Sequence, residues 1–348
     1  MSSLKLNANP GRGLSNSSQF WIVLLLTLGL ASAASWFTAK WLGFRFNSMS
    51  PFDYGAKDAP TRVFVASSSL GYYGLDWNEI ATEHDWSIRR YDIPGASPCE
   101  FEQTQDLVPN ATVSILVISM FDMDESYFSD FRAAMVPMGR TIQDLMGSHS
   151  EWSFTKRTLS QYPEHWIKTI FPTACSSIGV MVGFRAKLAE LHSGHGDAGD
   201  SDKAVLNGTN TIFPTARISD WDQGRFLRNS AGLISSAQGR HFFHGPKHDS
   251  LRRVLAKARD RGAVFLVVMP ASSSYQRLVT NERVAAEFEA SLANLARDFP
   301  DTHWVRLDEV KGLTDDKYFW DLMHLNVYGR EIATRELEKS LPKPLPSK

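Results

Sequence analysis

Two side chains near the C-terminus have the types and the spacing of an acid–base pair. Asp321 and His324 stand three residues apart in the stretch FWDLMHLNVYG, residues 319–329, which precedes a helical pattern. On a turn that enters a helix, this spacing lets the carboxylate orient the imidazole, and the other ring nitrogen can then take a proton from a nucleophile. We therefore predict that this pair activates a nucleophile supplied from elsewhere in the chain.

Three consecutive hydroxyls are candidates for that nucleophile. Ser67, Ser68 and Ser69 directly follow the apolar run RVFVA at residues 62–66. If this run is the first strand of an open α/β sheet, the serines lie at its carboxyl end, where such sheets bind their ligands. Serines after strands also commonly cap the next helix. The run alone therefore does not decide which serine reacts.

The remaining sequence predicts the elements that must position these residues. Short apolar runs without alternation are typical of parallel strands covered on both faces, and helical patterns separate them. The alternation predicts an α/β fold of three layers with a doubly wound, five-stranded parallel sheet of flavodoxin-like type. Strands are expected at 62–66, 87–93, 112–119, 263–269 and 302–307, and helices at about 76–84, 100–107, 249–261 and 281–298.

The chain divides into four predicted regions. Residues 1–19 form a tail, residues 20–41 an apolar segment, and residues 42–60 a linker that lacks periodicity and contains Gly and Pro. The α/β domain is expected at 61–345. More than 100 residues separate the third strand from the fourth, far more than an ordinary crossover needs, so we predict a large, mostly helical insertion at about 135–247.

The apolar segment is expected to enter a membrane. Residues 20–39 hold no charge over 20 positions, which is about the length that crosses a hydrocarbon core. Ala31-Ser32-Ala33 also resembles a processing site, so a cleaved signal peptide is the competing interpretation. Either interpretation exports the remaining chain, and an uncleaved helix would make it a single-pass membrane protein with its domain on the periplasmic or extracellular side.

Composition and charge exclude several other classes. The 348 residues are 43% hydrophobic and 22% charged, as in a folded globular chain. A formal net charge of -1, without long basic runs, excludes a nucleic-acid partner. No cofactor motif is present. His241, His244 and His248 lack neighbouring carboxylates that would complete a ligand set, so no metal is expected.

Four segments resemble sequence blocks of the SGNH (GDSL-like) hydrolase superfamily. The first and last blocks are represented by ASSSLGYYGLD at residues 66–76 and by the DxxHLNxxG pattern at 321–329. IPGASP at 93–98 resembles the glycine block. VMPAS at 268–272 resembles a strand end of the membrane-anchored, polysaccharide-modifying and DltD-like branches. The resemblance covers residues 62–122 and 249–341 and leaves the insertion out.

The resemblance implies a serine nucleophile, and its position depends on the residue used for counting. Ser68 is our first choice, with Ala66 taken as the counterpart of the small residue that the family has two positions before its nucleophile. Counting back from Gly74 favours Ser69, and Ser67 also stays open. No cofactor is implied.

The same resemblance assigns the other roles. His324 would be the general base and Asp321 its orienting carboxylate. The oxyanion hole would use the backbone N–H groups of Ser68 and Gly95. The family's further donor, an asparagine after the third strand, is missing, because this chain reads SMFD and ends that stretch with Asp122. An acidic side chain there would repel an oxyanion.

Together these features imply a membrane-tethered serine esterase or O-acyltransferase. Its substrates would be acyl esters, in particular acetyl esters, of a cell-envelope or secreted polysaccharide, and a multi-pass membrane acyltransferase could be its partner. Water or a sugar hydroxyl would resolve the acyl-enzyme. Two alternatives remain open: a non-catalytic binding or accessory protein of a polysaccharide acylation system, and a general lipase or esterase.

Overall fold

The computed structural model separates the chain into two compact units, which are described individually. Helix α1 (Asn16–Trp41) and residues 164–171 belong to one unit, and the strands of the sheet all belong to the other. The structure describes residues 16–41, 52–93, 95–128, 132–147, 152–171, 214–228 and 242–342.

A six-stranded, mostly parallel sheet forms the centre of the larger unit. Its order is β1-β3-β2-β4-β5-β6, and only β1 runs antiparallel to its neighbour. All five predicted strands are present, each within two residues of its expected bounds at either end. The strands are β1 (Phe52–Tyr54), β2 (Thr61–Ser67), β3 (Trp86–Asp92), β4 (Val113–Ile118), β5 (Ala263–Val268) and β6 (His303–Arg306).

The prediction of five strands was wrong by one, because β1 lies inside the segment expected to be a linker. Phe52–Tyr54 pairs with Ile88–Arg90 at the edge of the sheet. The guanidinium of Arg90 lies 4.9 Å from the ring centroids of both Phe52 and Tyr54, which holds this short strand in place. Three residues are too few to show a strand period in the sequence.

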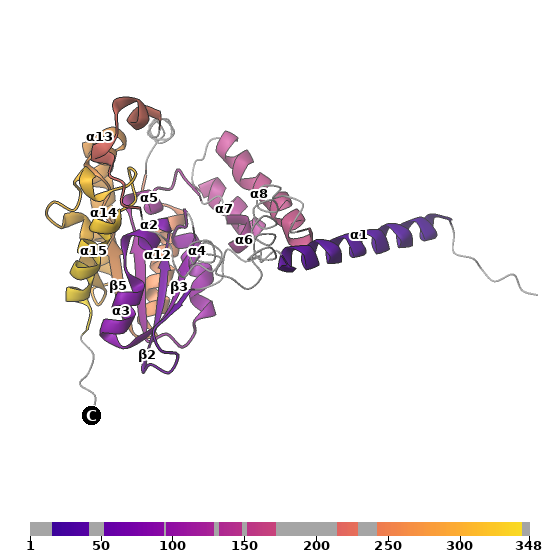
Figure 1. Ribbon diagram of the computed structural model, residues 1–348, viewed down its shortest axis with the longest axis horizontal. Coiled ribbons are helices and arrows are strands. Elements are labelled where there is room, and N and C mark those ends of the chain that lie inside the picture. Colours follow the sequence, from indigo (N-terminus) through magenta and orange to yellow (C-terminus); the bar gives the residue numbers. More distant parts are fainter. Residues whose placement is uncertain are drawn as a thin grey trace, which may run out of the picture. The chain divides into compact units, whose positions relative to one another are not determined.

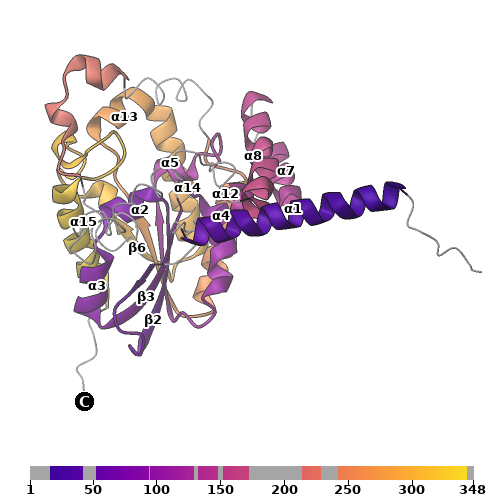
Figure 2. The same ribbon diagram turned by 45° about the vertical axis from the view of Figure 1, so that its right-hand side comes forward.

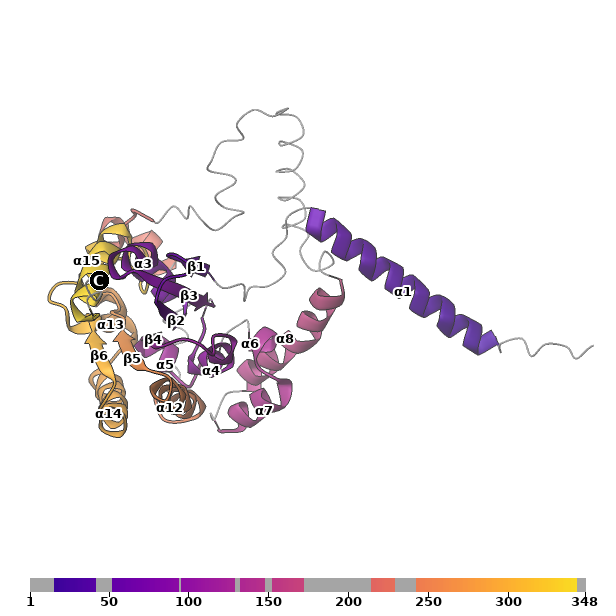
Figure 3. The ribbon, with the colours of Figure 1, turned by 90° about the horizontal axis from the view of Figure 1, so that it is seen from below.

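Helices cover both faces of the sheet (Figures 1 and 3). On one face α2 (Ser69–Gly74), α3 (Trp77–His84) and α15 (Val327–Ser340) bury apolar residues against Val63, Val65 and Val117. On the other face α4 (Pro98–Thr104), α12 (Pro246–Arg259) and α14 (Glu282–Asp298) pack on Phe64, Leu116 and Leu266. Successive residues of each central strand thus enter different cores, which explains their continuous apolar runs.

The predicted helix positions agree with the structure to within a few residues. Asp76 and Asn281 cap α3 and α14 by accepting hydrogen bonds from first-turn N–H groups. The other helices of the described residues are α5 (Met120–Met123), α6 (Arg132–Met135), α7 (Met138–Gly147), α8 (Trp152–Ile170) and α13 (Ser273–Val279), with 3₁₀ turns η1 (Gln105–Leu107), η2 (Ile218–Asp220), η3 (Leu307–Glu309) and η4 (Asp316–Tyr318).

The predicted insertion at about 135–247 is only partly described. Within the described residues it contributes α7 and α8, which Figure 2 labels, together with η2 and a helical segment at residues 223–228. The buried guanidinium of Arg132 ties α6 and α7 to α4, because it donates to Thr141 Oγ1 at 2.8 Å and Glu100 Oε1 at 3.4 Å and also pairs with Asp144. Residues 148–151, 172–213 and 229–241 of the predicted insertion lie outside the described residues.

The order of the sheet identifies where a ligand site belongs. Among the parallel strands, β2 lies between β3 and β4, and the chain winds outward from it in both directions, as in flavodoxin-like sheets. In such sheets the crevice lies at the carboxyl ends of the two strands where the order reverses, here β2 and β4. The residues at these ends are Ser67–Ser69 and Ser119–Asp122.

Helix α1 is long and apolar enough to cross a membrane. Its segment Gln19–Thr38 has a mean hydropathy of 1.9 over 20 residues, and almost none of it is buried by protein. The helix runs without a break through Ala31-Ser32-Ala33. Length and composition therefore agree with the predicted spanning segment.

Candidate active site

The side chains of Ser69, His324 and Asp321 form a hydrogen-bonded chain. Ser69 Oγ lies 2.8 Å from His324 Nε2, and His324 Nδ1 lies 2.8 Å from Asp321 Oδ2. Ser69 follows β2, whereas the other two belong to the segment before α15, 255 positions away from the serine in the case of His324. The order of hydroxyl, imidazole and carboxylate is that of a serine triad.

The structure places Ser69 at the imidazole, rather than the predicted Ser68. Ser68 is the N-cap of α2, and its hydroxyl accepts a hydrogen bond from the Leu70 N–H at 3.2 Å. Ser67 is the fully buried last residue of β2. Its hydroxyl packs 2.7 Å from the position that a Cβ on Gly71 would occupy. The three serines thus have three different positions, and Ser69 is the one whose hydroxyl lies at hydrogen-bonding distance from His324.

Asp321 is held as an ionised acceptor. Its Oδ1 accepts the backbone N–H groups of Met323 and His324 at 2.8 and 2.7 Å, while Oδ2 faces the imidazole. Burial raises the pKa of this carboxyl, but the hydrogen bond and charge of His324, with the two backbone donors, outweigh burial and leave the pKa below its usual value. The carboxylate therefore fixes Nδ1 as the protonated nitrogen, which leaves Nε2 as an acceptor for Ser69.

Asn326 and Gly329, two further residues of the DxxHLNxxG pattern, hold the loop between Asp321 and α15 in place. Asn326, fully buried, caps α15 through Oδ1 and donates from Nδ2 to the carbonyls of Lys317 and Ala216. A Cβ on Gly329 would lie 2.5 Å from the Tyr318 carbonyl oxygen, so this close approach requires glycine. Asn326 and Gly329 thus explain why the pattern is longer than the acid–base pair alone.

Ser272 also holds the loop that carries Asp321 and His324, and this contact was not predicted from the sequence. Ser272, in the turn after β5, donates from Oγ to the Leu322 carbonyl at 2.8 Å, between Asp321 and His324. The same hydroxyl accepts the Tyr275 N–H and so caps α13. The VMPAS segment was recognised only as a resemblance, because its contact with residue 322 depends on the fold.

Two aromatic rings flank the imidazole. Trp320 stacks on His324 with ring centroids 5.4 Å apart and an angle of 23°, and Tyr73 meets both rings edge-on at 5.3 and 5.4 Å. Burial, with the nearby charges of Tyr72 and Asp321, raises the pKa of Tyr73, so its phenol stays neutral. The rings limit the orientations that the imidazole can adopt.

Gly95, the predicted second oxyanion donor, follows β3. Its φ of +64° lies in the left-handed region that favours glycine. A Cβ at this position would lie 3.1 Å from the Tyr127 hydroxyl, so the phenol covers the glycine closely. The following turn is fixed by Glu100, which accepts from both N and Oγ of Ser97.

Asp122 is buried at the carboxyl end of β4, and only 2% of it is exposed. The sequence interpretation expected an acidic side chain here to repel an oxyanion. Burial raises its pKa to about 7 against the opposing effects of Ser119, Ser68, Lys247 and His324. The carboxyl is therefore largely neutral below pH 7, and the expected repulsion of an oxyanion does not apply there.

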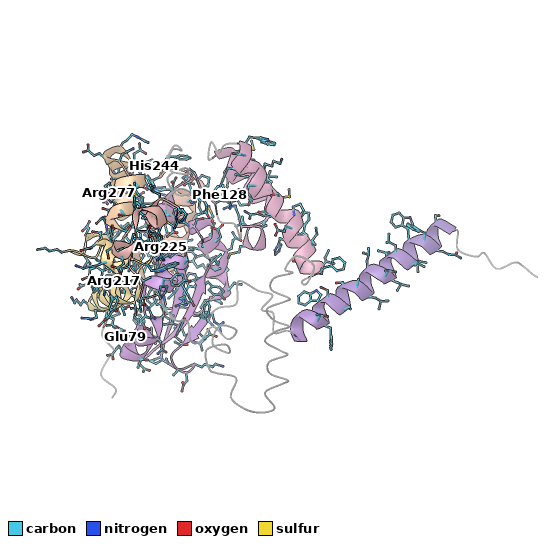
Figure 4. The ribbon with its side chains drawn as sticks, turned by 45° about the horizontal axis from the view of Figure 1, so that its top comes forward. Glu79, Phe128, Arg217, Arg225, His244 and Arg277 are labelled. Carbon is cyan, nitrogen blue, oxygen red and sulfur yellow. The ribbon has the colours of Figure 1, made fainter. Side chains whose placement is uncertain are left out.

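The described residues contain no group of three or more potential metal ligands. His244, labelled in Figure 4, meets His248 edge-on with ring centroids 5.6 Å apart, and His241 lies outside the described residues. Burial lowers the pKa of His248, which lies near the start of α12.

Comparison with known proteins gives only distant similarities. No protein-family profile matches the chain, and no curated protein is similar to it in sequence. Among solved structures, a lipase/acylhydrolase from Enterococcus faecalis matches 80% of this chain and 94% of its own, with 8% identity and a TM-score of 0.37. A catalytic mutant of an acetylxylan esterase from Geobacillus stearothermophilus matches 83% of this chain and 98% of its own, with 8% identity and a TM-score of 0.38. Likeness at this level establishes neither a shared activity nor a shared substrate.

Proposed function

We propose that this chain is a membrane-tethered serine esterase or O-acyltransferase that acts on acetyl esters of a cell-envelope or secreted polysaccharide. The observation that carries the proposal is the continuous hydrogen-bonded chain from Ser69 through His324 to Asp321. It lies at the carboxyl edge of the sheet, beside the reversal of strand order. The proposal shifts the nucleophile from Ser68 to Ser69 and keeps the roles of the other two residues.

The geometry supports an ordinary two-step acyl transfer. Ser69 Oγ attacks the ester carbonyl carbon while His324 Nε2 takes its proton, and Asp321 stabilises the imidazolium. The imidazolium then protonates the leaving sugar oxygen, and an acyl-serine remains. Water or a second sugar hydroxyl next gives its proton to Nε2 and attacks the acyl carbon, which returns the proton to Ser69 and releases an acid or a new ester.

Two features of the site support a small acyl group on a sugar. The Tyr127 hydroxyl lies 3.1 Å from the position that a Cβ on Gly95 would occupy, so this phenol borders the predicted oxyanion donor. The rings of Tyr73 and Trp320 beside His324 are flat apolar surfaces suited to the apolar face of a sugar ring. Export through α1 would bring the site to envelope or secreted glycans.

We expect purified protein to hydrolyse acetyl esters in preference to long acyl esters. Because the Tyr127 phenol lies against Gly95, kcat/KM for 4-nitrophenyl acetate should exceed that for the dodecanoate by roughly 10-fold or more. Acetylated polysaccharide, measured by acetate release, should be cleaved as well. Ser69→Ala is the matched control for both substrates. Preference for dodecanoate would favour the general lipase, and no turnover of any ester by the intact protein would favour the accessory protein.

We expect α1 to remain attached to the mature protein. Membrane-fraction protein should keep the residues of α1 in N-terminal mass spectrometry and should resist extraction with carbonate. Leu26→Lys, near the centre of the span, should reduce membrane insertion because a central lysine costs about 2.5–3.5 kcal/mol, whereas Leu26→Ala should not. A mature N-terminus at Ala34 would show that the segment is a cleaved signal peptide.

A further inference from the structure

Asp122 occupies the second of the two strand ends that border the crevice. β4 pairs with β2 in parallel, with Ala66 opposite Leu116, so the residues after both strands emerge at the same edge. Ser69 follows β2 by two residues, and Asp122 follows β4 by four. The carboxyl is also close enough to Ser68 and His324 for both to influence its titration.

The two oxygens of this carboxyl have different surroundings. Oδ2 accepts a hydrogen bond from Ser119 Oγ at 2.9 Å, and that hydroxyl in turn accepts the Asp122 N–H at 3.1 Å. Ser119 has thus used its one proton on Oδ2. Oδ1 is fully buried and has no hydrogen bond of ordinary length and angle among the described residues. A buried polar atom without a partner is unfavourable unless a ligand completes its hydrogen bonding.

The charges around Asp122 do not suffice to keep it ionised. Lys247 from α12 and His324 from the loop before α15 favour the anion, as do the hydroxyls of Ser119 and Ser68. Tyr275 from α13 also lies within electrostatic range. Burial outweighs these groups and raises the pKa of Asp122 to about 7. With Oδ2 engaged as an acceptor, the proton belongs on Oδ1.

We propose that the neutral carboxyl of Asp122 donates a hydrogen bond from Oδ1 to the oxyanion that forms when Ser69 attacks an ester. This inference rests on the proposed function and assigns to Asp122 the donor role that an amide would otherwise supply. The proton stays on Asp122 throughout, so the step adds no proton transfer to the mechanism. A carboxylic acid kept neutral in an apolar site can serve an oxyanion in this way.

The pH dependence of kcat tests the proposal directly. With 4-nitrophenyl acetate, wild-type kcat should fall above about pH 7, because Asp122 loses the proton that it donates. Asp122→Asn keeps a donor at every pH, so its kcat should stay high above pH 8. Asp122→Ala should lower kcat at pH 6 by roughly 100-fold or more, with a small change in KM, as loss of one oxyanion donor does.

Glu125 provides a matched control, because burial raises its pKa to about 7 as well. It accepts the N–H groups of Lys247 and His248 at the start of α12, so its titration affects structure rather than the reacting atoms. Glu125→Gln should retain the alkaline loss of kcat. If Asp122→Asn also retains that loss, or if Asp122→Ala has wild-type kcat at pH 6, the donor role is wrong.

Two further measurements separate this inference from the proposed function and from misfolding. Turnover that persists in Ser69→Ala would show that the serine mechanism is wrong. Turnover that depends on Ser69 but is unchanged by Asp122 substitutions would show that only the donor role of Asp122 is wrong. The folded-state pKa of Asp122 is raised above its unfolded value near 3.9, so the stability this proton confers is present at acidic pH and lost as pH rises through about 7. The Tm of Asp122→Asn should therefore exceed that of wild type by more at pH 8 than at pH 5. A Tm difference that is the same at pH 5 and at pH 8 would show that the Asp122 carboxyl is not neutral in the folded protein.

Discussion

Ser69→Ala is expected to lower kcat on acetyl esters by about 10⁵ to 10⁶-fold, since it removes the only hydroxyl of the serine run that contacts His324. His324→Ala should cause a loss of the same order, because the remaining hydroxyl would have no base. The double variant should lose little more than either single variant, since members of a triad act as one unit. Single-turnover acyl release, together with labelling by a fluorophosphonate probe, measures these effects against a low background.

The neighbouring serines are matched controls for this result. Ser68→Ala removes the cap of α2 and should lower stability by about 1 kcal/mol, with a change in kcat of less than 10-fold. Ser67→Ala alters a buried contact with Gly71 and should not abolish labelling. A loss confined to Ser68→Ala would restore the register first expected from the sequence. Equal turnover in Ser67→Ala, Ser68→Ala and Ser69→Ala would favour the non-catalytic interpretation.

The acid–base pair could be predicted because its geometry is largely local. Asp321 reaches both the imidazole and the N–H groups of residues 323 and 324 within one turn, so the spacing in the sequence defines the contact. Long apolar runs likewise marked the buried strands, and the helical patterns between them required two covered faces. The location of the site at the carboxyl ends of the strands followed from the alternation of these elements, whereas the strand order came from the structure.

The position of the nucleophile among the three serines could not be predicted. A helix cap and a nucleophile both require a hydroxyl side chain, and all three residues carry one. The end of β2 and the start of α2 lie one residue apart, and Ser68 alone lies between them. The sequence does not show on which residue the strand stops. Counting from Gly74 gave Ser69, since that glycine belongs to the same short helix as the nucleophile.

The protonation of Asp122 depends on burial, which residue type does not reveal. The sequence shows an acid where an amide was expected, and an acid in water is ionised. Only the packing around the end of β4 removes water from this carboxyl and raises its pKa. The edge strand β1 was missed for a related reason, because the contacts of Arg90 with Phe52 and Tyr54 link segments far apart in sequence.

Asp321→Asn should lower kcat by roughly 10⁴-fold, less than loss of Ser69 or His324, and should leave the fold intact. Oδ1 of Asp321 accepts two backbone N–H groups, so the amide oxygen of asparagine should take that place. The amide NH₂ then faces His324 Nδ1, which must become the acceptor, and the ring proton moves to Nε2. Nε2 can no longer take the proton of Ser69. Nitrogen-15 spectra of the imidazole should show this change of tautomer, with Tm within a few degrees of wild type; a wild-type tautomer with full activity would show that Asp321 does not orient the base.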